Sequence, residues 1–254
     1  MPLTPTWCPG CGNFGIFGAI TAALKELRLT PKQTVFVYDV GCSGNMADFL
    51  PNPGFHGLHG RAIPLAAGIK LGNPQQKVFV IIGDGGAYGE GAGHFLEACR
   101  ANFDLTVIVH NNGLYSLTTG QKSPTTPQGT ITPSTPDGVI ETAFNPLSTA
   151  LVNSATFVAR GFSGHIPQLT DLIVKGTKHE GLALIDVLQP CITFNKIQTY
   201  AWYRERLYDL QASGHNPADF NAALRRSAET EKLPTGIFYQ TSRKSFHEYF
   251  NWLD

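Results

Sequence analysis

Two short stretches carry residues of the kind that hold a phosphorylated ligand together with a metal ion. Gly83-Asp84-Gly85-Gly86 follows one apolar run, and Asn111-Asn112-Gly113-Leu114-Tyr115 follows another. Glycine lets backbone N–H groups approach a phosphate because no Cβ stands in the way. The side-chain oxygens of Asp84 and Asn112 are ligands that Mg²⁺ takes, and a diphosphate can supply others. The spacing therefore predicts a site for a diphosphate and Mg²⁺.

Each of these stretches begins where a predicted buried strand ends. Strands are predicted at residues 78–82 and 105–109, which are strongly apolar. A third strand is predicted at 34–40; its first five residues are mostly apolar too, and it is followed by Gly41-Cys42-Ser43-Gly44-Asn45. Short apolar runs of this type are typical of parallel strands that are covered on both faces. The carboxyl ends of parallel strands lie at one edge of a sheet, so we expect the three following loops to meet there.

The first three-quarters of the chain alternate between predicted strands and helices. Further strands are predicted at 156–159 and 183–187, and helices at 14–29, 62–71, 90–102, 145–151 and 166–179. This alternation predicts an α/β fold with a doubly wound parallel sheet. It stops near residue 196, so we divide the chain into an α/β domain of residues 1–195 and a C-terminal extension of residues 196–254, with a helix at 217–229.

Composition excludes several classes of protein. The formal net charge is zero and there is no block of basic residues, so we expect no nucleic-acid partner. No apolar run approaches membrane-spanning length and residues 1–6 lack a signal-peptide pattern, so we expect a cytoplasmic protein with no membrane contact. Charged residues make up only 15% of the chain, which leaves apolar surface for a partner chain to cover.

The five cysteines are too few and too unevenly spaced for a disulfide scaffold. Cys99 lies within a predicted helix and is most simply a core thiol. The others, Cys8, Cys11, Cys42 and Cys191, suit a [4Fe–4S] cluster or tetrahedral zinc, and their spacing alone does not decide between these. Cys8-Pro9-Gly10-Cys11 also matches a thioredoxin-like redox motif. The six residues before Trp7 include two prolines and offer no preceding strand, so a redox dithiol stays only as an alternative.

Taken in order, the motifs resemble those of the β subunits of 2-oxoacid:ferredoxin oxidoreductases. The resemblance covers nearly the whole chain and is carried by Trp7-Cys8-Pro9-Gly10-Cys11-Gly12, Val40-Gly41-Cys42-Ser43-Gly44, Gly54-Phe55-His56-Gly57-Leu58-His59-Gly60-Arg61, Gly83-Asp84-Gly85 and Asn111-Asn112-x-x-Tyr115-x-x-Thr118-x-Gly120-Gln121-x-Ser123-Pro124-Thr125.

This resemblance implies a thiamine diphosphate-binding fold and a defined reaction. A 2-oxo acid would be decarboxylated oxidatively with coenzyme A, giving acyl-CoA and CO₂. Electrons would pass through thiamine diphosphate and a [4Fe–4S] cluster to ferredoxin. The chain would work with an alpha subunit, with or without gamma and delta subunits.

The resemblance also implies roles for individual residues. Mg²⁺ would be held by Asp84, Asn112 and the carbonyl group of Leu114. The cluster would be held by Cys8, Cys11, Cys42 and Cys191. We expect His59 and Arg61 to point at the cofactor or substrate, and His94 and His110 to serve packing or support. Cofactor contacts would fall on Gly41, Cys42, Ser43, Gly83, Gly85, Gly86, Ser116 and Leu117.

Two positions depart from the pattern of the relatives. Asn45 stands where many carry Lys or Arg, a cation suited to a substrate carboxylate. As a candidate catalytic residue, Asn45 therefore favours pyruvate or a branched or aromatic 2-oxo acid over 2-oxoglutarate. Gly86 replaces an Asp that many relatives carry after Gly-Asp-Gly, so the sequence predicts that one polar contact near the diphosphate is missing.

The resemblance further implies that the active site is shared. Thiamine chemistry needs a Glu beside the aminopyrimidine ring, and in this family the partner subunit supplies it. Glu90 and Glu97 of this chain are predicted to lie in the helix after the diphosphate loop, on the wrong side for that task. We therefore expect half an active site.

Two other interpretations remain. One is a thiamine diphosphate-dependent decarboxylase subunit without electron transfer, against which the four placed cysteines count. The other is a scaffold subunit whose cysteines hold zinc and whose diphosphate loop is vestigial. Absorbance near ~400 nm distinguishes a cluster from colourless zinc.

Overall fold

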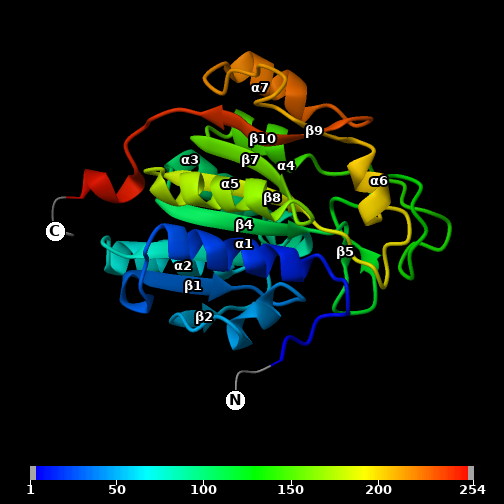
Figure 1. Cartoon of the computed structure of the whole chain (residues 1–254), viewed down its shortest axis with the longest axis horizontal. Coiled ribbons are helices and arrows are strands. Elements are labelled where there is room, and N and C mark those ends of the chain that lie inside the picture. Colours follow the sequence, from blue (N-terminus) through cyan, green and yellow to red (C-terminus); the bar gives the residue numbers. More distant parts are fainter. Residues whose placement is uncertain (1–3, 251–254) are drawn as a thin grey trace.

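The computed structural model describes residues 4–250, which form one eight-stranded sheet with helices on both faces (Figure 1). The strand order is β2-β1-β3-β4-β8-β7-β10-β9, and every pair is parallel except β10 with β7. The strands are β1 (Thr34–Tyr38), β2 (Gly54–His56), β3 (Lys77–Gly83), β4 (Leu105–Asn111), β7 (Phe157–Phe162), β8 (Leu182–Leu188), β9 (Leu207–Asp209) and β10 (Leu233–Gln240); β5 (Leu114–Tyr115) pairs separately with β6 (Gln121–Lys122).

Five of these strands, β1, β3, β4, β7 and β8, confirm the predicted parallel core. Nearly all of their residues are buried, because helices cover both faces of the sheet. Helices α1 (Asn13–Glu26) and α5 (Ile166–Lys178) share one face, and α2 (Ala62–Gly72), α3 (Ala92–Ala101) and α4 (Pro146–Val152) cover the other (Figure 1). No helix within residues 4–250 is long and apolar enough to cross a membrane.

The structure differs from the sequence prediction at the two ends of the sheet and after β3. β2 lies in a segment for which no strand is predicted, and β9 and β10 come from the C-terminal part of the chain. That part also forms α6 (Tyr200–Arg204), which was not predicted, and α7 (Phe220–Ser227), which lies within the helix predicted at 217–229. The sheet therefore continues through residues on both sides of 195, and the domain boundary there stays a prediction. The helix predicted at 90–102 begins only at Ala92, because the turn Gly86–Glu90 is a π-helix.

The parallel core brings the chemically interesting loops to one edge. In register, β1 ends beside β3, β3 beside β4, and β4 beside β8. Asp39, Asp84, Asn112 and Gln189 each come directly after one of these strands. The prediction that the loops after the strands meet is therefore confirmed for this edge.

Asn102 ties this core to the C-terminal segment. It ends α3 in the left-handed conformation, with φ 58°, and its side chain is fully buried. Its Oδ1 accepts hydrogen bonds from Thr156 Oγ1 at 2.7 Å and from the Leu182 N–H at 3.0 Å. Its Nδ2 donates to the Arg243 carbonyl at 2.9 Å. One side chain thus joins α3, the starts of β7 and β8, and the last described part of the chain.

We predict that Asn102→Ala destabilises the protein by about 2–5 kcal/mol. Alanine in the left-handed conformation costs roughly 1–2 kcal/mol, and a buried donor left without an acceptor costs about 1–3 kcal/mol. Denaturant unfolding measures the loss. Asn153→Ala is the matched control, because Asn153 ends α4 with φ −95° and bonds only within its helix. Equal losses in the two variants would contradict the role of Asn102.

Candidate active site

Asp84 is a carboxylate buried at the end of β3, with an exposed fraction of 1%. It accepts hydrogen bonds from the hydroxyls of Ser123 at 2.5 Å and Thr125 at 2.6 Å, and a longer one from the Asn112 N–H at 3.4 Å. These partners are all neutral. Burial therefore prevails over the hydrogen bonds and raises the pKa of Asp84 to about 6.

Asn112 is held in the turn that follows β4. Its Oδ1 accepts from the Leu114 N–H at 2.9 Å and from Ser116 Oγ at 3.1 Å. The Asn112 N–H contact brings this turn against Asp84. The predicted Mg²⁺ ligands Asp84, Asn112 and Leu114 consequently line one cavity.

A buried polar network underneath holds the neighbouring residue, Asn111. Asp186 of β8 is fully buried and accepts hydrogen bonds from Asn111 Nδ2 at 3.1 Å and from Tyr88 OH at 2.9 Å. Arg160 Nε lies 3.5 Å from the same carboxylate and forms an ion pair. On its other side, Asn111 Oδ1 lies 2.9 Å from Thr125 Oγ1, which also contacts Asp84. The network therefore fixes the end of β4 relative to Asp84.

The cavity above Asp84 has a volume of about 80 Å³. Every residue predicted to contact the cofactor lines it: Gly41, Cys42, Ser43, Gly83, Gly85, Gly86, Ser116 and Leu117. Two of its buried polar atoms, Ser43 Oγ and His110 Nε2, have no hydrogen-bond partner among residues 4–250. Unpaired buried polar atoms are costly unless a ligand satisfies them. The lining therefore fits a polar group such as a diphosphate.

His110 faces this cavity, although the sequence predicts only a packing or supporting role for it. Its Nδ1 lies 2.7 Å from Asn13 Oδ1, and Asn13 Nδ2 donates to the Cys42 carbonyl at 3.4 Å. Burial lowers the pKa of His110 to about 3, so the imidazole is neutral at physiological pH.

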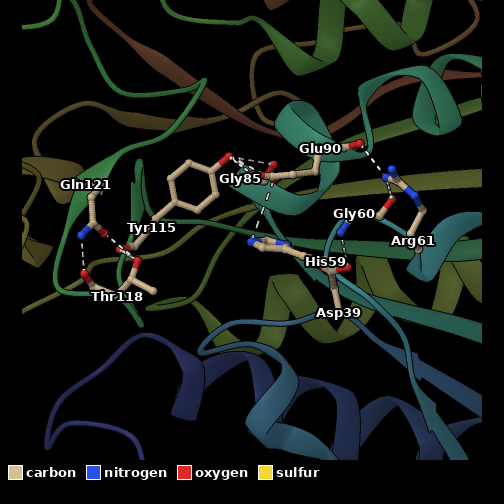
Figure 2. Close-up of polar contacts among 9 residues, drawn as sticks. All are labelled: Asp39, His59, Gly60, Arg61, Gly85, Glu90, Tyr115, Thr118 and Gln121. Carbon is tan, nitrogen blue, oxygen red and sulfur yellow. Dashed lines mark hydrogen bonds and ion pairs between the residues drawn. The ribbon is translucent and has the colours of Figure 1, made fainter. Parts of the chain in front are cut away.

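His59 and Arg61 leave the same loop in different directions (Figure 2). His59 lines the cavity, with its Nδ1 2.9 Å from Asp39 Oδ2 and its Nε2 4.0 Å from Glu90 Oε2. Arg61 instead donates to the backbone carbonyls of Glu90 at 2.8 Å and Gly60 at 3.4 Å. Its guanidinium holds the loop, and the expected contact of Arg61 with cofactor or substrate stays a prediction.

Glu90 lies closer to the cavity than was expected from the helix predicted at residues 90–102. It ends the π-helical turn, and its carboxylate accepts a hydrogen bond from Tyr115 OH at 3.0 Å (Figure 2). Tyr115 in turn packs against Gly85, where a Cβ would lie 2.2 Å from the ring. Gly85 thus has to be glycine for the tyrosine to lie along the phosphate loop.

The remaining predicted ligands, Cys8, Cys11, Cys42 and Cys191, line a second cavity of about 190 Å³. Cys42 lines both cavities. Burial, reinforced by the charges of the other three thiolates, raises the pKa of Cys42 to about 12. Among residues 4–250, no three His, Cys, Asp or Glu side chains are grouped closely enough for a single metal ion. Cys99 is buried in α3, away from this cavity, as predicted.

Asn45 lies in the cysteine cavity, apart from His59. Its Nδ2 donates to Thr6 Oγ1 at 3.2 Å. Leu117, Ile192 and Phe194 line the same cavity, and no Lys or Arg side chain of the described chain does. The three candidate catalytic residues Asn45, His59 and Arg61 therefore do not converge in this chain.

The site also contains residues to which sequence analysis assigned no role. Ser123 and Thr125 belong to the quoted Ser-Pro-Thr motif, so the motif itself was the available signal for their contact with Asp84. Asp39 and Asp186 gave no such signal, because each follows or lies within an apolar strand as a single acidic residue.

Comparisons with known proteins agree with this geometry. The family model "Thiamine pyrophosphate enzyme, C-terminal TPP binding domain" matches residues 39–187, and the model for the C terminus of the pyruvate ferredoxin oxidoreductase beta subunit matches residues 191–254. The chain is 47% identical to the 2-oxoacid:ferredoxin oxidoreductase subunit beta of Saccharolobus solfataricus, over 95% of this chain and 84% of that protein. It is 42% identical to subunit beta of 2-oxoacid:ferredoxin oxidoreductase 1 of Aeropyrum pernix, over 95% and 80%.

A solved structure is also similar. The 2-oxoglutarate:ferredoxin oxidoreductase from Magnetococcus marinus, with 2-oxoglutarate, coenzyme A and succinyl-CoA bound, superposes with a TM-score of 0.95 and 35% identity. The match covers 98% of this chain and 86% of that one.

A mostly parallel sheet with these loops at its carboxyl edge defines a thiamine diphosphate-binding domain. Within that class the chain belongs to the β subunits of the 2-oxoacid:ferredoxin oxidoreductases and is a subunit of that enzyme complex.

We predict that Asp84→Asn separates stability from cofactor retention. The pKa of Asp84 is raised from 3.8 to about 6. Protonation of this carboxyl therefore stabilises the folded state fully below about pH 4, and the contribution is lost as the pH rises through 6. At pH 8 without cofactor, the neutral amide should therefore stabilise the protein by up to about 3 kcal/mol.

Thermal melts of the assembled complex provide the measurement. Asp84→Asn should melt higher than wild type at pH 8, lose this advantage near pH 4, and gain nothing from thiamine diphosphate with Mg²⁺. Asp48→Asn, at an exposed position, is the control. A cofactor-induced shift in Asp84→Asn equal to that of wild type would show that this loop does not hold the metal.

Proposed function

We propose that this chain holds the diphosphate end of thiamine diphosphate through Mg²⁺, with Asp84, Asn112 and the Leu114 carbonyl as its metal ligands. One observation carries the proposal: the Asp84 carboxylate is buried among neutral partners, and burial raises its pKa. A divalent cation beside it would compensate the ionised form and remove that cost. Asn112 Oδ1 and the Leu114 backbone lie in the adjoining turn.

The chain's own groups around the metal would orient the diphosphate. Ser43 Oγ and His110 Nε2 are unpaired polar atoms of the same cavity, and Gly85 brings backbone into it. Thiamine diphosphate itself supplies the electron sink that the decarboxylation of a 2-oxo acid requires. Ser123 and Thr125 hold Asp84 in place through hydrogen bonds to its Oδ2.

The size of the cavity supports a shared active site. Its volume is about 80 Å³, whereas small-molecule sites typically enclose about 300–1,000 Å³. An alpha subunit would supply the remaining walls, including the Glu for the aminopyrimidine ring. We propose further that gamma and delta subunits, ferredoxin and coenzyme A are partners of the assembled enzyme. The chain alone would be inactive.

For the cysteines we propose a [4Fe–4S] cluster held by Cys8, Cys11, Cys42 and Cys191. All four line one cavity of about 190 Å³, and four thiolates around one space suit such a cluster. Cys42 borders both cavities, so a cluster there would stand next to the cofactor and could pass its electrons on toward ferredoxin.

We predict that Cys8→Ser, Cys11→Ser, Cys42→Ser and Cys191→Ser each lower the iron content and bleach the band near ~400 nm. Cys42→Ser should reduce turnover most. Cys99→Ser is the matched control and should leave the iron content unchanged, because Cys99 is a buried thiol of α3. Iron loss confined to Cys99→Ser, or an intact band in all four others, would overturn the ligand set.

For the substrate we propose a 2-oxo acid with an uncharged tail, such as pyruvate or a branched or aromatic one. Asn45 is neutral, and the cavity it lines contains apolar Leu117, Ile192 and Phe194 with no Lys or Arg of the described chain. The distal carboxylate of a dicarboxylic 2-oxo acid would therefore have no cation of the described chain to pair with in this cavity. The 2-oxoglutarate in the Magnetococcus marinus structure is a property of that protein.

We predict that the wild-type complex favours pyruvate or 2-oxoisovalerate over 2-oxoglutarate, and that Asn45→Lys shifts kcat/KM toward 2-oxoglutarate. A hydrogen bond to a charged group contributes about 1.5–3 kcal/mol, which corresponds to roughly tenfold to hundredfold. Asn45→Gln is the control for side-chain length without charge. A wild-type preference for 2-oxoglutarate, or no shift in Asn45→Lys, would refute the assignment.

A further inference from the structure

Asp39 is a fully buried carboxylate at the end of β1, and both of its oxygens are engaged. Oδ1 accepts the Gly60 N–H at 2.7 Å, and Oδ2 lies 2.9 Å from His59 Nδ1 (Figure 2). The two contacts hold consecutive residues of one loop, so the carboxylate fixes both the backbone of the loop and the direction of the imidazole ring.

The space for this carboxylate exists only because residue 86 has no side chain. A Cβ on Gly86 would lie 2.1 Å from Asp39 Oδ2 and 3.2 Å from Ile82 Cγ1. Real Cβ atoms do not approach other atoms so closely, and Asp39 cannot withdraw without releasing His59. Gly86 and Asp39 therefore form a matched pair in which one position lacks a side chain and the other fills the volume.

This geometry bears on the expectation that a polar contact is missing at Gly86, which the resemblance implied. A carboxylate nevertheless occupies that volume, and it arrives from the end of β1 rather than from the phosphate loop.

We propose that Asp39 is the positioning residue for His59, and that the absence of a side chain at Gly86 makes the room its carboxylate needs. The proposal rests on the proposed function in one respect, that the cavity lined by His59 receives the cofactor. With Nδ1–H donated to Asp39, the ring presents Nε2 to the cavity side. There it faces Glu90 at 4.0 Å, and the edge-on ring contact with Tyr115, at 5.9 Å between centroids, limits its rotation.

The first test changes only the chemistry of the Asp39–His59 contact. Asp39→Asn preserves shape, but its amide can place an N–H toward Nδ1, which imposes the other tautomer on His59. In the assembled complex, Asp39→Asn should lower kcat about tenfold to hundredfold, the effect of losing a hydrogen bond to a charged group. Asp48→Asn, at an exposed position, is the matched control.

A double-mutant cycle separates positioning from general damage. Asp39→Asn combined with His59→Gln should be no slower than His59→Gln alone, since Asp39 acts through His59. If the two losses multiplied instead, or if Asp39→Asn kept kcat within twofold of wild type, the positioning role would be refuted.

The second test exchanges the two positions. Gly86→Asp alone should lower the melting temperature of the complex, because its side chain collides with Asp39. The combined Asp39→Gly and Gly86→Asp variant should recover the melting temperature, and its kcat should exceed that of Asp39→Gly at least tenfold. Recovery of neither quantity would overturn the matched pair, and recovery of melting temperature alone would overturn the positioning role.

The tests also keep this proposal distinct from the proposed function. Calorimetric titration of thiamine diphosphate with Mg²⁺ into the wild-type complex tests the cofactor site independently. If that titration fails, the proposed function fails, while the melting temperatures of the exchanged variants still test the matched pair.

Discussion

The carboxylate of Asp84 is buried at the end of β3 among neutral partners, and the arrangement of the surrounding loops follows from that constraint. A buried ionised group needs hydrogen bonds and a counter-charge. The described chain supplies hydrogen bonds, from the Asn112 N–H and from the hydroxyls of Ser123 and Thr125, which lie 39 and 41 positions later in the sequence. The long segment after β4 therefore has to fold back to the end of β3, where its hydroxyls reach Asp84.

The sequence predicted the parallel core because its strands are buried on both faces and leave a continuous apolar signal. β1, β3, β4, β7 and β8 were all located in this way. β2 escaped prediction because its three residues are exposed and form a strand only by pairing with β1. β10 escaped it because Pro234 and Gly236 interrupt its pattern, and its pairing with β7 is a contact between distant parts of the chain.

The candidate site, too, contains residues that the sequence could indicate and residues that only the fold reveals. Glycines and oxygen ligands at strand ends are local signals, and the residues that the resemblance implies as cofactor contacts all line one cavity, whereas His110 of that cavity was expected only to pack or support. Asp39 and Asp186 contact partners 20 to 98 positions away, among them His59 and Tyr88. Only tertiary structure shows that these single acids, after or within apolar strands, orient the loops. Sequence reasoning likewise grouped Asn45 with His59, whereas the fold directs them to different cavities.

The central claim is that this chain carries the metal-dependent half of a thiamine diphosphate site. Titrating thiamine diphosphate into cofactor-free assembled complex, with Mg²⁺ or with a chelator, tests it most directly. We expect one cofactor bound per copy of this chain, with binding lost in the chelator. Binding of undiminished affinity without a divalent cation would contradict it.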